Sequence, residues 1–192
     1  RFYLSTNAAL DGSALLLGNF DYSRPAAVPA GGSYTQQVAL ALPGVRAGEY
    51  FLLLHADGAN FFTEPNEANN LLAMPLHIDN PDLIPTDFIV PVSVVVTQLS
   101  QGFEASWSVL NQGVGAAVTV WPDYIYLSRT NVLDASAVFL WWKGRYVALA
   151  PGESYTAIDN VRLPDGIEGD FFLLMETDGS HQLYESRETN NL

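Results

Sequence analysis

Two clusters of oxygen-bearing side chains offer the most distinctive chemistry in this sequence. Each contains one Asp, two Glu and two Asn residues in the same order and at the same spacing. The first cluster is Asp57, Glu64, Glu67, Asn69 and Asn70, and the second is Asp178, Glu185, Glu188, Asn190 and Asn191. Calcium prefers about six to eight oxygen ligands, mostly carboxylate and carbonyl. A turn that gathers these side chains predicts a Ca²⁺ site, although neither cluster follows the EF-hand pattern.

A structural role is the alternative explanation for both clusters. Asp-Gly dipeptides at residues 57–58 and 178–179 favour tight hairpin turns. Asn side chains cap turns and tolerate left-handed backbone conformations. The sequence therefore leaves two explanations open, in which the oxygen atoms serve either a calcium ion or the backbone of a turn.

The other residues that could support catalysis lack the necessary partners. The histidines are His55, His77 and His181, and none of them has the spacing of a metal site. The chain has no G-x-S-x-G motif, and its lack of cysteine excludes disulfides, thiolate metal sites and a cysteine nucleophile. Paired carboxylates suit glycoside hydrolysis, but their occurrence in two equivalent clusters favours a scaffold role. We therefore predict that the protein is not an enzyme.

The composition limits the partners of the chain. Lys and Arg total 8 against 21 Asp and Glu, which gives a net charge of −13 over 192 residues. A charge of this sign opposes binding to nucleic-acid phosphates and to anionic lipid surfaces. The sequence has no apolar run of about 18 residues, so we expect no membrane insertion. Hydrophobic residues make up 48% of the chain, which is enough for packed cores in one or two domains.

The two clusters belong to an internal repeat. Residues 28–71 match residues 149–192 at an offset of 121, with 17 identities in 44 positions. Residues 2–17 match residues 125–140 at an offset of 123, with 8 identities in 16 positions. This ordered series indicates a repeat unit of about 121 residues. The chain begins within one unit and ends near the end of the next, so we expect it to be part of a longer protein.

The repeat predicts two domains that meet near residues 79–82. Residues 1–79 form the C-terminal part of a first domain, which has no counterpart of residues 82–124. Residues 80–192 form a second domain that is nearly complete but lacks the counterpart of residues 72–78. A linker this short restricts the orientations that the two domains can adopt.

Hydrophobic alternation with a period of two runs through both domains, and no long segment has a clean helical period. We predict strands at residues 71–78, 92–97, 103–109, 123–128, 138–142, 146–149, 154–163 and 169–176, and a last strand containing Leu183 and Tyr184. Trp107 alternates with serines, so we expect it to be a core tryptophan. Short strands separated by turn signals indicate an all-β chain of tandem immunoglobulin-like β-sandwiches, the first lacking its N-terminal strands.

Trp141 and Trp142 form a second candidate ligand-binding feature, because indole faces stack on sugars. Adjacent side chains in a strand lie on opposite faces, so we expect at least one of the two to be exposed. The corresponding residues of the first repeat are Gly18 and Asn19, so the pair is not a property of the repeat. Packing in the core or at a sheet edge is the alternative role.

The second repeat contains an ordered series of short motifs that resembles a known family. The series runs Asp82-Leu83, Asn111-Gln112-Gly113, residues 125–128, residues 149–155, Leu163-Pro164, residues 169–172, Asp178 and the E-x-x-E-x-N-N ending at 185–191. It resembles the CARDB domain, a cell-adhesion-related repeat of bacterial and archaeal extracellular proteins that is close to the APHP family. The resemblance covers the second repeat and the latter half of the first. It implies an immunoglobulin-like, non-catalytic module without a fixed ligand.

These observations lead to one main functional prediction. We expect a non-catalytic structural and adhesive repeat module of a large bacterial cell-surface or secreted protein, located outside the cell. Its partners are neighbouring repeats or subunits of the same protein, and calcium stiffens its turns. Strand complementation supplies the strands that the first domain lacks, either from the same protein or from a neighbouring subunit in a filament or array. The alternative is a carbohydrate- or protein-binding accessory module of a secreted enzyme, with surface glycans or proteins as ligands.

Overall fold

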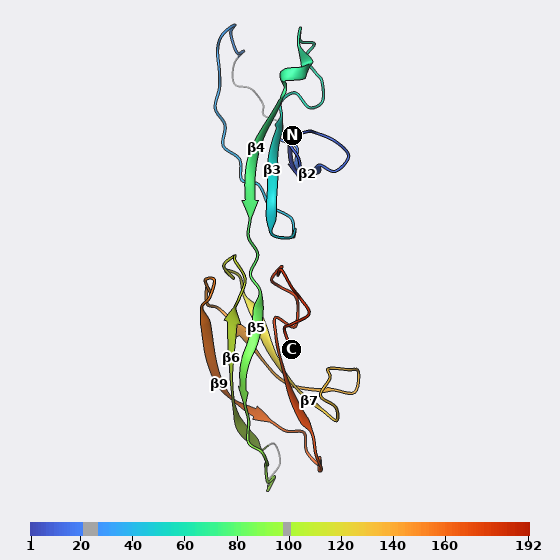
Figure 1. Ribbon diagram of the computed structural model, residues 1–192, viewed down its shortest axis with the longest axis vertical. Helices are drawn as coiled ribbons and strands as arrows, with labels where there is room; N and C mark the ends of the chain where they lie inside the picture. The colour runs from blue at the N-terminus through green and yellow to red at the C-terminus, as the bar shows by residue number, and fades with distance from the viewer. Residues whose placement is uncertain (21–26, 98–100) are drawn as a thin grey trace. The chain divides into compact units, whose positions relative to one another are not determined.

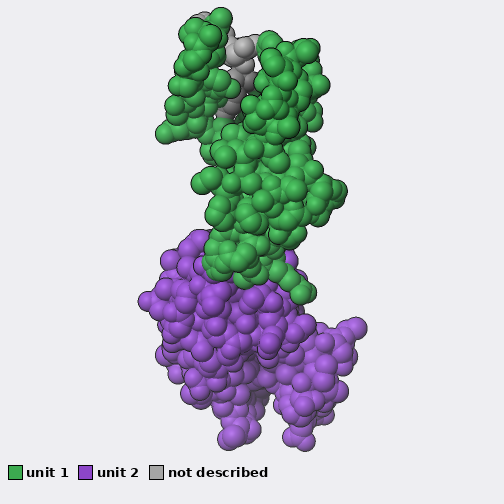
Figure 2. All heavy atoms as spheres, turned by 45° about the horizontal axis from the view of Figure 1, so that its top comes forward, with its two compact units in different colours: residues 1–78 green, residues 79–192 purple. Residues whose placement is uncertain are grey.

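The computed structural model describes residues 1–20, 27–97 and 101–192. This described part is all-β, with one short 3-10 helix and otherwise strands, turns and loops. The chain divides into two compact units, residues 1–78 (unit 1) and residues 79–192 (unit 2), which Figure 2 shows in different colours. Within the described ranges, no helix is long and apolar enough to cross a membrane.

Unit 1 forms one antiparallel sheet in its described part, with the strand order β2-β1-β3-β4 (Figure 1). Its elements are β1 (Phe2–Ser5), β2 (Leu15–Gly18), β3 (Gly48–His55), the 3-10 helix η1 (Glu67–Asn69) and β4 (Leu71–Ile78). β3 and β4 pair along their full lengths, from Gly48 opposite Ile78 to His55 opposite Leu71. The predicted strand at residues 71–78 is therefore confirmed.

Unit 2 is a sandwich of two three-stranded antiparallel sheets, with the orders β5-β6-β9 and β10-β7-β8. Figure 1 labels β5, β6, β7 and β9. Its strands are β5 (Leu83–Ile89), β6 (Gly102–Asn111), β7 (Trp121–Ser128), β8 (Val138–Arg145), β9 (Ser154–Arg162) and β10 (Phe172–Thr177). Trp107 and Val109 of β6 join Ile125 of β7 and Met175 of β10 in a single buried cluster. The two sheets therefore pack face to face, which confirms the predicted all-β class and the core position of Trp107.

The segment 33–41 of unit 1 belongs to no strand and is mostly exposed. Its counterpart in unit 2 is the whole of β9, which pairs with β6 from Ser154 opposite Leu110 to Arg162 opposite Gly102. Among its described residues, unit 1 has no counterpart of β6. A strand needs a partner for its backbone N–H and C=O groups, so the same sequence pattern forms a strand only in unit 2.

Two strand predictions between β5 and β9 are wrong. Residues 92–97 form no strand, because β5 lies upstream of them and Pro91 lacks the N–H group needed to extend its ladder. Val92 and Val95 are accordingly exposed. Residues 146–149 form no strand either, because β8 continues only to Arg145 and a single bridge then joins Leu149 to Ala117.

The predicted last strand around Leu183 and Tyr184 is also absent from the described part of unit 2. The carboxylate of Asp178 accepts the backbone N–H of Leu183 at 2.9 Å. This bond occupies a donor that a strand ladder needs, so the segment folds as a turn. Leu183 is nevertheless 6% exposed and packs in the core, whereas Tyr184 is 46% exposed.

Candidate functional site

Both predicted oxygen clusters lie in a loop that follows an equivalent strand. We call residues 57–70, after β3, the acidic turn of unit 1, and residues 178–191, after β10, the acidic turn of unit 2. Asp57 and Asp178 have nearly the same left-handed backbone, with φ of 43° and 46°, and the residues three positions later have φ of 55° and 50°. Asp tolerates this conformation better than most residues. The sequence repeat is therefore also a repeat of backbone geometry.

In unit 2 the carboxylates of the acidic turn hold its backbone in place. Asp178 accepts the backbone N–H groups of Gln182 and Leu183, each at 2.9 Å. Glu188 accepts the backbone N–H of Glu185 at 2.9 Å. These bonds satisfy donors that no strand partner satisfies, and they direct the side chain of Leu183 into the core.

Glu185 and the two asparagines join the acidic turn of unit 2 to the beginning of β5. Glu185 is 3% exposed, and one of its carboxylate oxygens accepts the backbone N–H of Leu83. The other accepts the side-chain amide of Asn191 at 2.8 Å. Asn190 donates its side-chain amide to Asp82 at 2.8 Å. The turn thus fixes the first residue of a strand that belongs to the opposite sheet.

The acidic turn of unit 1 repeats the local bonds without the long-range ones. Asp57 accepts the backbone N–H groups of the residues four and five positions later, at 2.9 and 2.8 Å. Glu67 accepts the backbone N–H of Glu64 at 2.8 Å. The side-chain amide of Asn70 donates to Glu67 at 3.2 Å, whereas its counterpart Asn191 donates to Glu185. Glu64 and Asn69 are exposed. Their side chains make no hydrogen bond within the described residues, whereas their counterparts hold the start of β5 in unit 2.

The carboxylates of the unit 2 turn lie close together. One oxygen from each of Asp178, Glu185 and Glu188 lies within 4.8 Å of the other two. Burial raises the pKa of Asp178, and it raises the pKa of Glu185 to about 7, with the nearby negative charges adding to both effects. His181 lies 3.0 Å from Glu188, and the bond between them raises the pKa of the imidazole. A cation near this cluster is therefore favoured, whether it is a proton or a metal ion.

The donor set of the unit 2 turn fits calcium. Asn191 is 4% exposed, yet its side-chain carbonyl has no hydrogen-bond partner in the described part of the chain, and the same holds for the side-chain carbonyl of Asn190. Carboxylate and amide oxygens are the ligands that Ca²⁺ prefers. Within the described residues of unit 1, the predicted ligands do not form a comparable group of three carboxylates.

Asp123 is a buried acid to which the sequence patterns assign no role. It is 1% exposed and accepts hydrogen bonds from Trp107 Nε1 at 2.8 Å, the Tyr155 hydroxyl at 2.7 Å, Arg145 Nε at 2.6 Å and Thr177 Oγ1 at 2.9 Å. Four strands from both sheets are thereby joined to β7. The position of Asp123 in β7 could have indicated its burial from the sequence, because it shares the core-facing side of the strand with the apolar residues two and four positions later.

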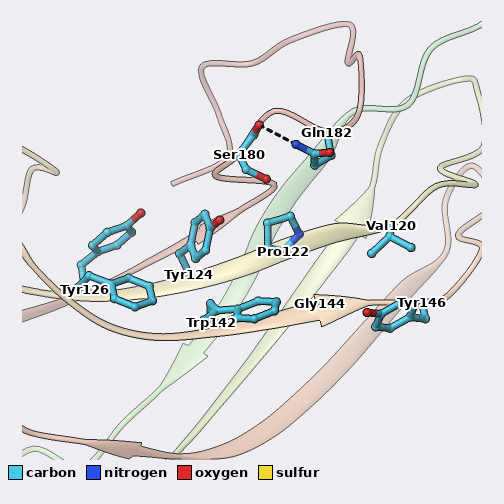
Figure 3. Close-up of a pocket in the computed structure, with 10 residues that line it drawn as sticks. Val120, Pro122, Tyr124, Tyr126, Trp142, Gly144, Tyr146, Ser180 and Gln182 are labelled. Atoms are coloured by element: carbon cyan, nitrogen blue, oxygen red, sulfur yellow. Dashed lines mark hydrogen bonds between the residues drawn. The ribbon is translucent and has the colours of Figure 1, made fainter.

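A groove lined by aromatic rings lies on the outer face of β7 and β8 (Figure 3). Its volume is about 760 Å³, which is within the range of small-molecule sites. The rings that line it are those of Tyr124, Tyr126, Phe139, Trp142 and Tyr146. Trp142 is 56% exposed, whereas Trp141 packs against the core. Of the two tryptophans predicted to bind ligand, Trp142 lines this groove and Trp141 does not.

Polar groups complete the wall of the groove. The Tyr126 hydroxyl donates to Glu176 at 3.2 Å, and burial together with the charge of Glu176 raises the pKa of Tyr126 to about 12. Ser180 and Gln182 of the acidic turn lie across from the rings, where the side-chain amide of Gln182 donates to the backbone carbonyl of Ser180 at 3.3 Å (Figure 3). The groove therefore combines ring faces with neutral hydrogen-bonding groups.

Unit 1 has a smaller hollow at the equivalent place, between β2 and its own acidic turn. The volume of this hollow is about 310 Å³. Arg1 and Asn19 line it at the positions where Tyr124 and Trp142 line the groove of unit 2, and Asp57 contributes as well. The fold thus makes a depression at this place in both units, and the side chains that line it differ in chemistry.

Comparisons with known proteins identify no family for this chain. No protein-family model matches it, and no curated protein matches it. Three solved structures that match are β-glucosidases. The enzyme from Kluyveromyces marxianus is 20% identical with a TM-score of 0.35, and the match covers 56% of this chain and 13% of that one. An enzyme from intestinal bacteria involved in saponin metabolism is 18% identical with a TM-score of 0.33, and the match covers 61% of this chain and 16% of that one.

The third is a β-glucosidase from Streptomyces venezuelae in complex with D-glucose. It is 20% identical with a TM-score of 0.27, and the match covers 61% of this chain and 15% of that one. The chain thus spans between 13% and 16% of the length of these enzymes. Matches with these identities and TM-scores do not assign a function to the chain.

Proposed function

We propose that the chain is a non-catalytic structural and adhesive module, made of repeated β-units in a cell-surface or secreted protein. The observation that carries this proposal is the acidic turn, which forms the same local hydrogen bonds in both units. A repeated site in which carboxylates accept backbone N–H groups serves to hold a fold together. Its carboxylates thereby have a structural role that accounts for their positions in both repeats.

The proposal includes strand complementation of unit 1. In unit 2, Glu185 accepts the N–H of Leu83 at the start of β5, and β5, β6 and β9 cover the core. Unit 1 has the exposed Glu64 at the position of Glu185 and the unpaired segment 33–41 at the position of β9. We infer that two strands equivalent to β5 and β6 complete unit 1, with Glu64 accepting the first N–H. A preceding repeat or a neighbouring subunit supplies them.

Burial at one pair of equivalent positions supports this inference. Phe62 is 53% exposed in unit 1, whereas its counterpart Leu183 is 6% exposed in the core of unit 2. Burying a side chain of this size stabilises a fold by about 1.5–3 kcal/mol. Strands that cover the sheet of unit 1 would therefore find apolar surface that is still in contact with water.

An extended chain tests the proposal. Residues 79–123, placed ahead of Arg1, give unit 1 its own copy of the missing strands in the register of the repeat. We expect calorimetry to show unit 1 stabilised by roughly 3 kcal/mol or more, because Phe62 and its neighbours become buried and segment 33–41 gains a partner.

Two variants of the extended chain act as controls. Trp107→Asp within the added copy alone is expected to abolish the gain. Glu64→Ala is expected to reduce it by about 1–2 kcal/mol, since the first strand loses its acceptor, while leaving the original chain unchanged. An extended chain in which unit 1 melts as before would contradict strand complementation.

We further propose a Ca²⁺ site that is confined to the acidic turn of unit 2. Asp178, Glu185 and Glu188 would hold the ion together with the side-chain carbonyl of Asn191. The ion would supply positive charge among carboxylates that repel one another. The support is the close approach of the three carboxylates and the buried carbonyl that no described donor satisfies.

Calcium is expected to raise the melting temperature of unit 2 by several degrees relative to EDTA, because the ion binds the folded turn and not the unfolded chain. Calorimetry in millimolar CaCl₂, in MgCl₂ and in EDTA measures this effect. Glu188→Gln should remove the shift, whereas the equivalent Glu67→Gln in unit 1 should leave it intact. Equal melting temperatures of the wild-type chain in calcium and in EDTA would contradict the site.

A further inference from the structure

We propose that the aromatic groove of unit 2 binds a neutral sugar chain, whose pyranose faces stack on its exposed rings. This inference depends neither on strand complementation nor on calcium. The rings of Phe139 and Tyr146 are 51% and 81% exposed, and that of Trp142 is 56% exposed. Three large apolar surfaces kept in water at one place indicate a binding surface rather than a packing defect.

Three of the five rings are held in position by contacts with one another. Tyr124, Tyr126 and Phe139 contact one another edge to face, with centroids 5.8 to 6.2 Å apart. Trp142 lies directly opposite Tyr124 in the pairing of β7 with β8. Aromatic contacts of this kind restrict ring rotation. The part of the platform that these three rings form is therefore ordered by folding and not by the ligand.

The chemistry of the groove favours a neutral carbohydrate. None of the residues that line it is Lys, Arg, Asp or Glu, although the chain as a whole has a net charge of −13. Aromatic faces suit the C–H faces of a pyranose, and a hydroxyl and an amide opposite them suit its hydroxyl groups. Ser180 and Gln182 provide such groups across from the rings (Figure 3). An anionic ligand would find no counter-charge in the lining, since it contains no Lys or Arg.

The equivalent hollow of unit 1 shows that the fold does not require these rings. Arg1 and Asn19 line it where Tyr124 and Trp142 line the groove. Unit 1 folds its β2-β1-β3 sheet with the same strand pairing as the β8-β7-β10 sheet. The aromatic lining is therefore a property of unit 2 that packing of the common sheet does not explain.

Titration with neutral oligosaccharides tests the proposal on the full chain. The probes are hexamers of β-1,4-glucose, β-1,3-glucose, β-1,4-mannose and β-1,4-N-acetylglucosamine, with oligogalacturonate as a charged comparison. Tryptophan fluorescence reports binding, because Trp107 and Trp121 are almost fully buried and the exposed indole is that of Trp142. Isothermal calorimetry supplies the affinity. We expect at least one neutral hexamer to bind and oligogalacturonate not to bind.

Variants locate the site. Trp142→Ala is expected to weaken binding by about tenfold or more, and Tyr146→Ala to weaken it by a smaller factor. Phe61→Ala, which removes an exposed ring from the hollow of unit 1, should leave the affinity unchanged. Melting temperatures check that both groove variants remain folded, which their exposure leads us to expect.

Two results would overturn the proposal. One is the absence of binding by all four neutral hexamers at millimolar concentration, which would leave the rings as a contact for a protein partner. The other is binding that neither Trp142→Ala nor Tyr146→Ala changes, which would place the sugar elsewhere on the chain.

Discussion

Replacing Asp123 by Ala is expected to lower the free energy of unfolding of unit 2 by about 3–5 kcal/mol. The carboxylate accepts bonds from Trp107, Arg145, Tyr155 and Thr177, and the variant leaves these donors without it. Arg145 is 12% exposed in its side chain, so its charge would remain largely buried without the carboxylate that it pairs with. Breaking one side of a buried ion pair costs much more than losing an exposed pair.

Urea unfolding followed by tryptophan fluorescence measures this effect. All four tryptophans belong to unit 2, so the signal reports that unit alone. Asp159→Asn is the matched control, because Asp159 forms a more exposed pair with Lys143 at 2.8 Å. Losing this pair should lower the free energy of unfolding by less than about 1 kcal/mol. Similar losses in the two variants would show that the Asp123 network does not hold the sheets together.

The variant Glu185→Gln is expected to remove a pH dependence from the stability of unit 2. Burial raises the pKa of Glu185 to about 7 from an ordinary value of 4.5, so the folded state binds a proton more tightly than the unfolded state. The stability that this proton contributes is fully present below pH 4.5 and is lost as the pH rises through 7. In the wild-type chain, the free energy of unfolding of unit 2 should fall by about 2–3 kcal/mol over this rise in pH.

The glutamine amide does not titrate, so residue 185 adds no pH dependence to the free energy of unfolding of the variant. Its carbonyl can still accept the N–H of Leu83, and its NH₂ group can donate to the side-chain carbonyl of Asn191 after rotation of that amide. Urea unfolding in EDTA between pH 4.5 and pH 8 gives the two profiles without any contribution from metal ions. Glu64→Gln, at the exposed equivalent position, should follow the wild-type profile. If the free energies of unfolding of the wild-type chain and of Glu185→Gln changed with pH in parallel, the pH dependence assigned to Glu185 would be contradicted.

Strand alternation was the most reliable information in the sequence. The period of two at residues 103–109 predicted β6, and the alternating pattern at residues 71–78 predicted β4 with its bounds. Alternation reports which side chains share one face of a strand. In β6 that face is buried, whereas in β4 Leu72 and Met74 of the alternating face are 56% and 55% exposed. Trp107 alternates with serines and lies in the core as predicted, where it is 1% exposed.

Alternation could not show whether a segment has a partner. Residues 92–97 alternate but follow Pro91, which cannot extend the ladder of β5. Segment 33–41 matches β9 in sequence but forms no strand, because the described part of unit 1 contains no partner strand for it. Pairing in a sheet depends on residues far away in the sequence, and local periodicity contains no information about them.

For the candidate sites, the sequence predicted the residues but not their long-range contacts. The repeat identified the carboxylates of both acidic turns, because equivalent residues perform equivalent local tasks. It could not predict that Glu185 bonds to Leu83, since this contact joins residues far apart in the chain. Adjacent tryptophans had to face opposite ways, but only the curvature and packing of the sheet determine that Trp142 is the exposed one.

Hydrogen exchange at the backbone amides of residues 33–41 tests strand complementation most directly. In the chain of 192 residues these amides should exchange rapidly, because the segment belongs to no strand. In the chain extended by residues 79–123 ahead of Arg1, alternate amides of the segment should become protected, as they are expected to be in β9. Protection in the extended chain alone is the predicted result. Equal, rapid exchange in both chains, with β9 protected, would contradict the claim that strand complementation completes unit 1.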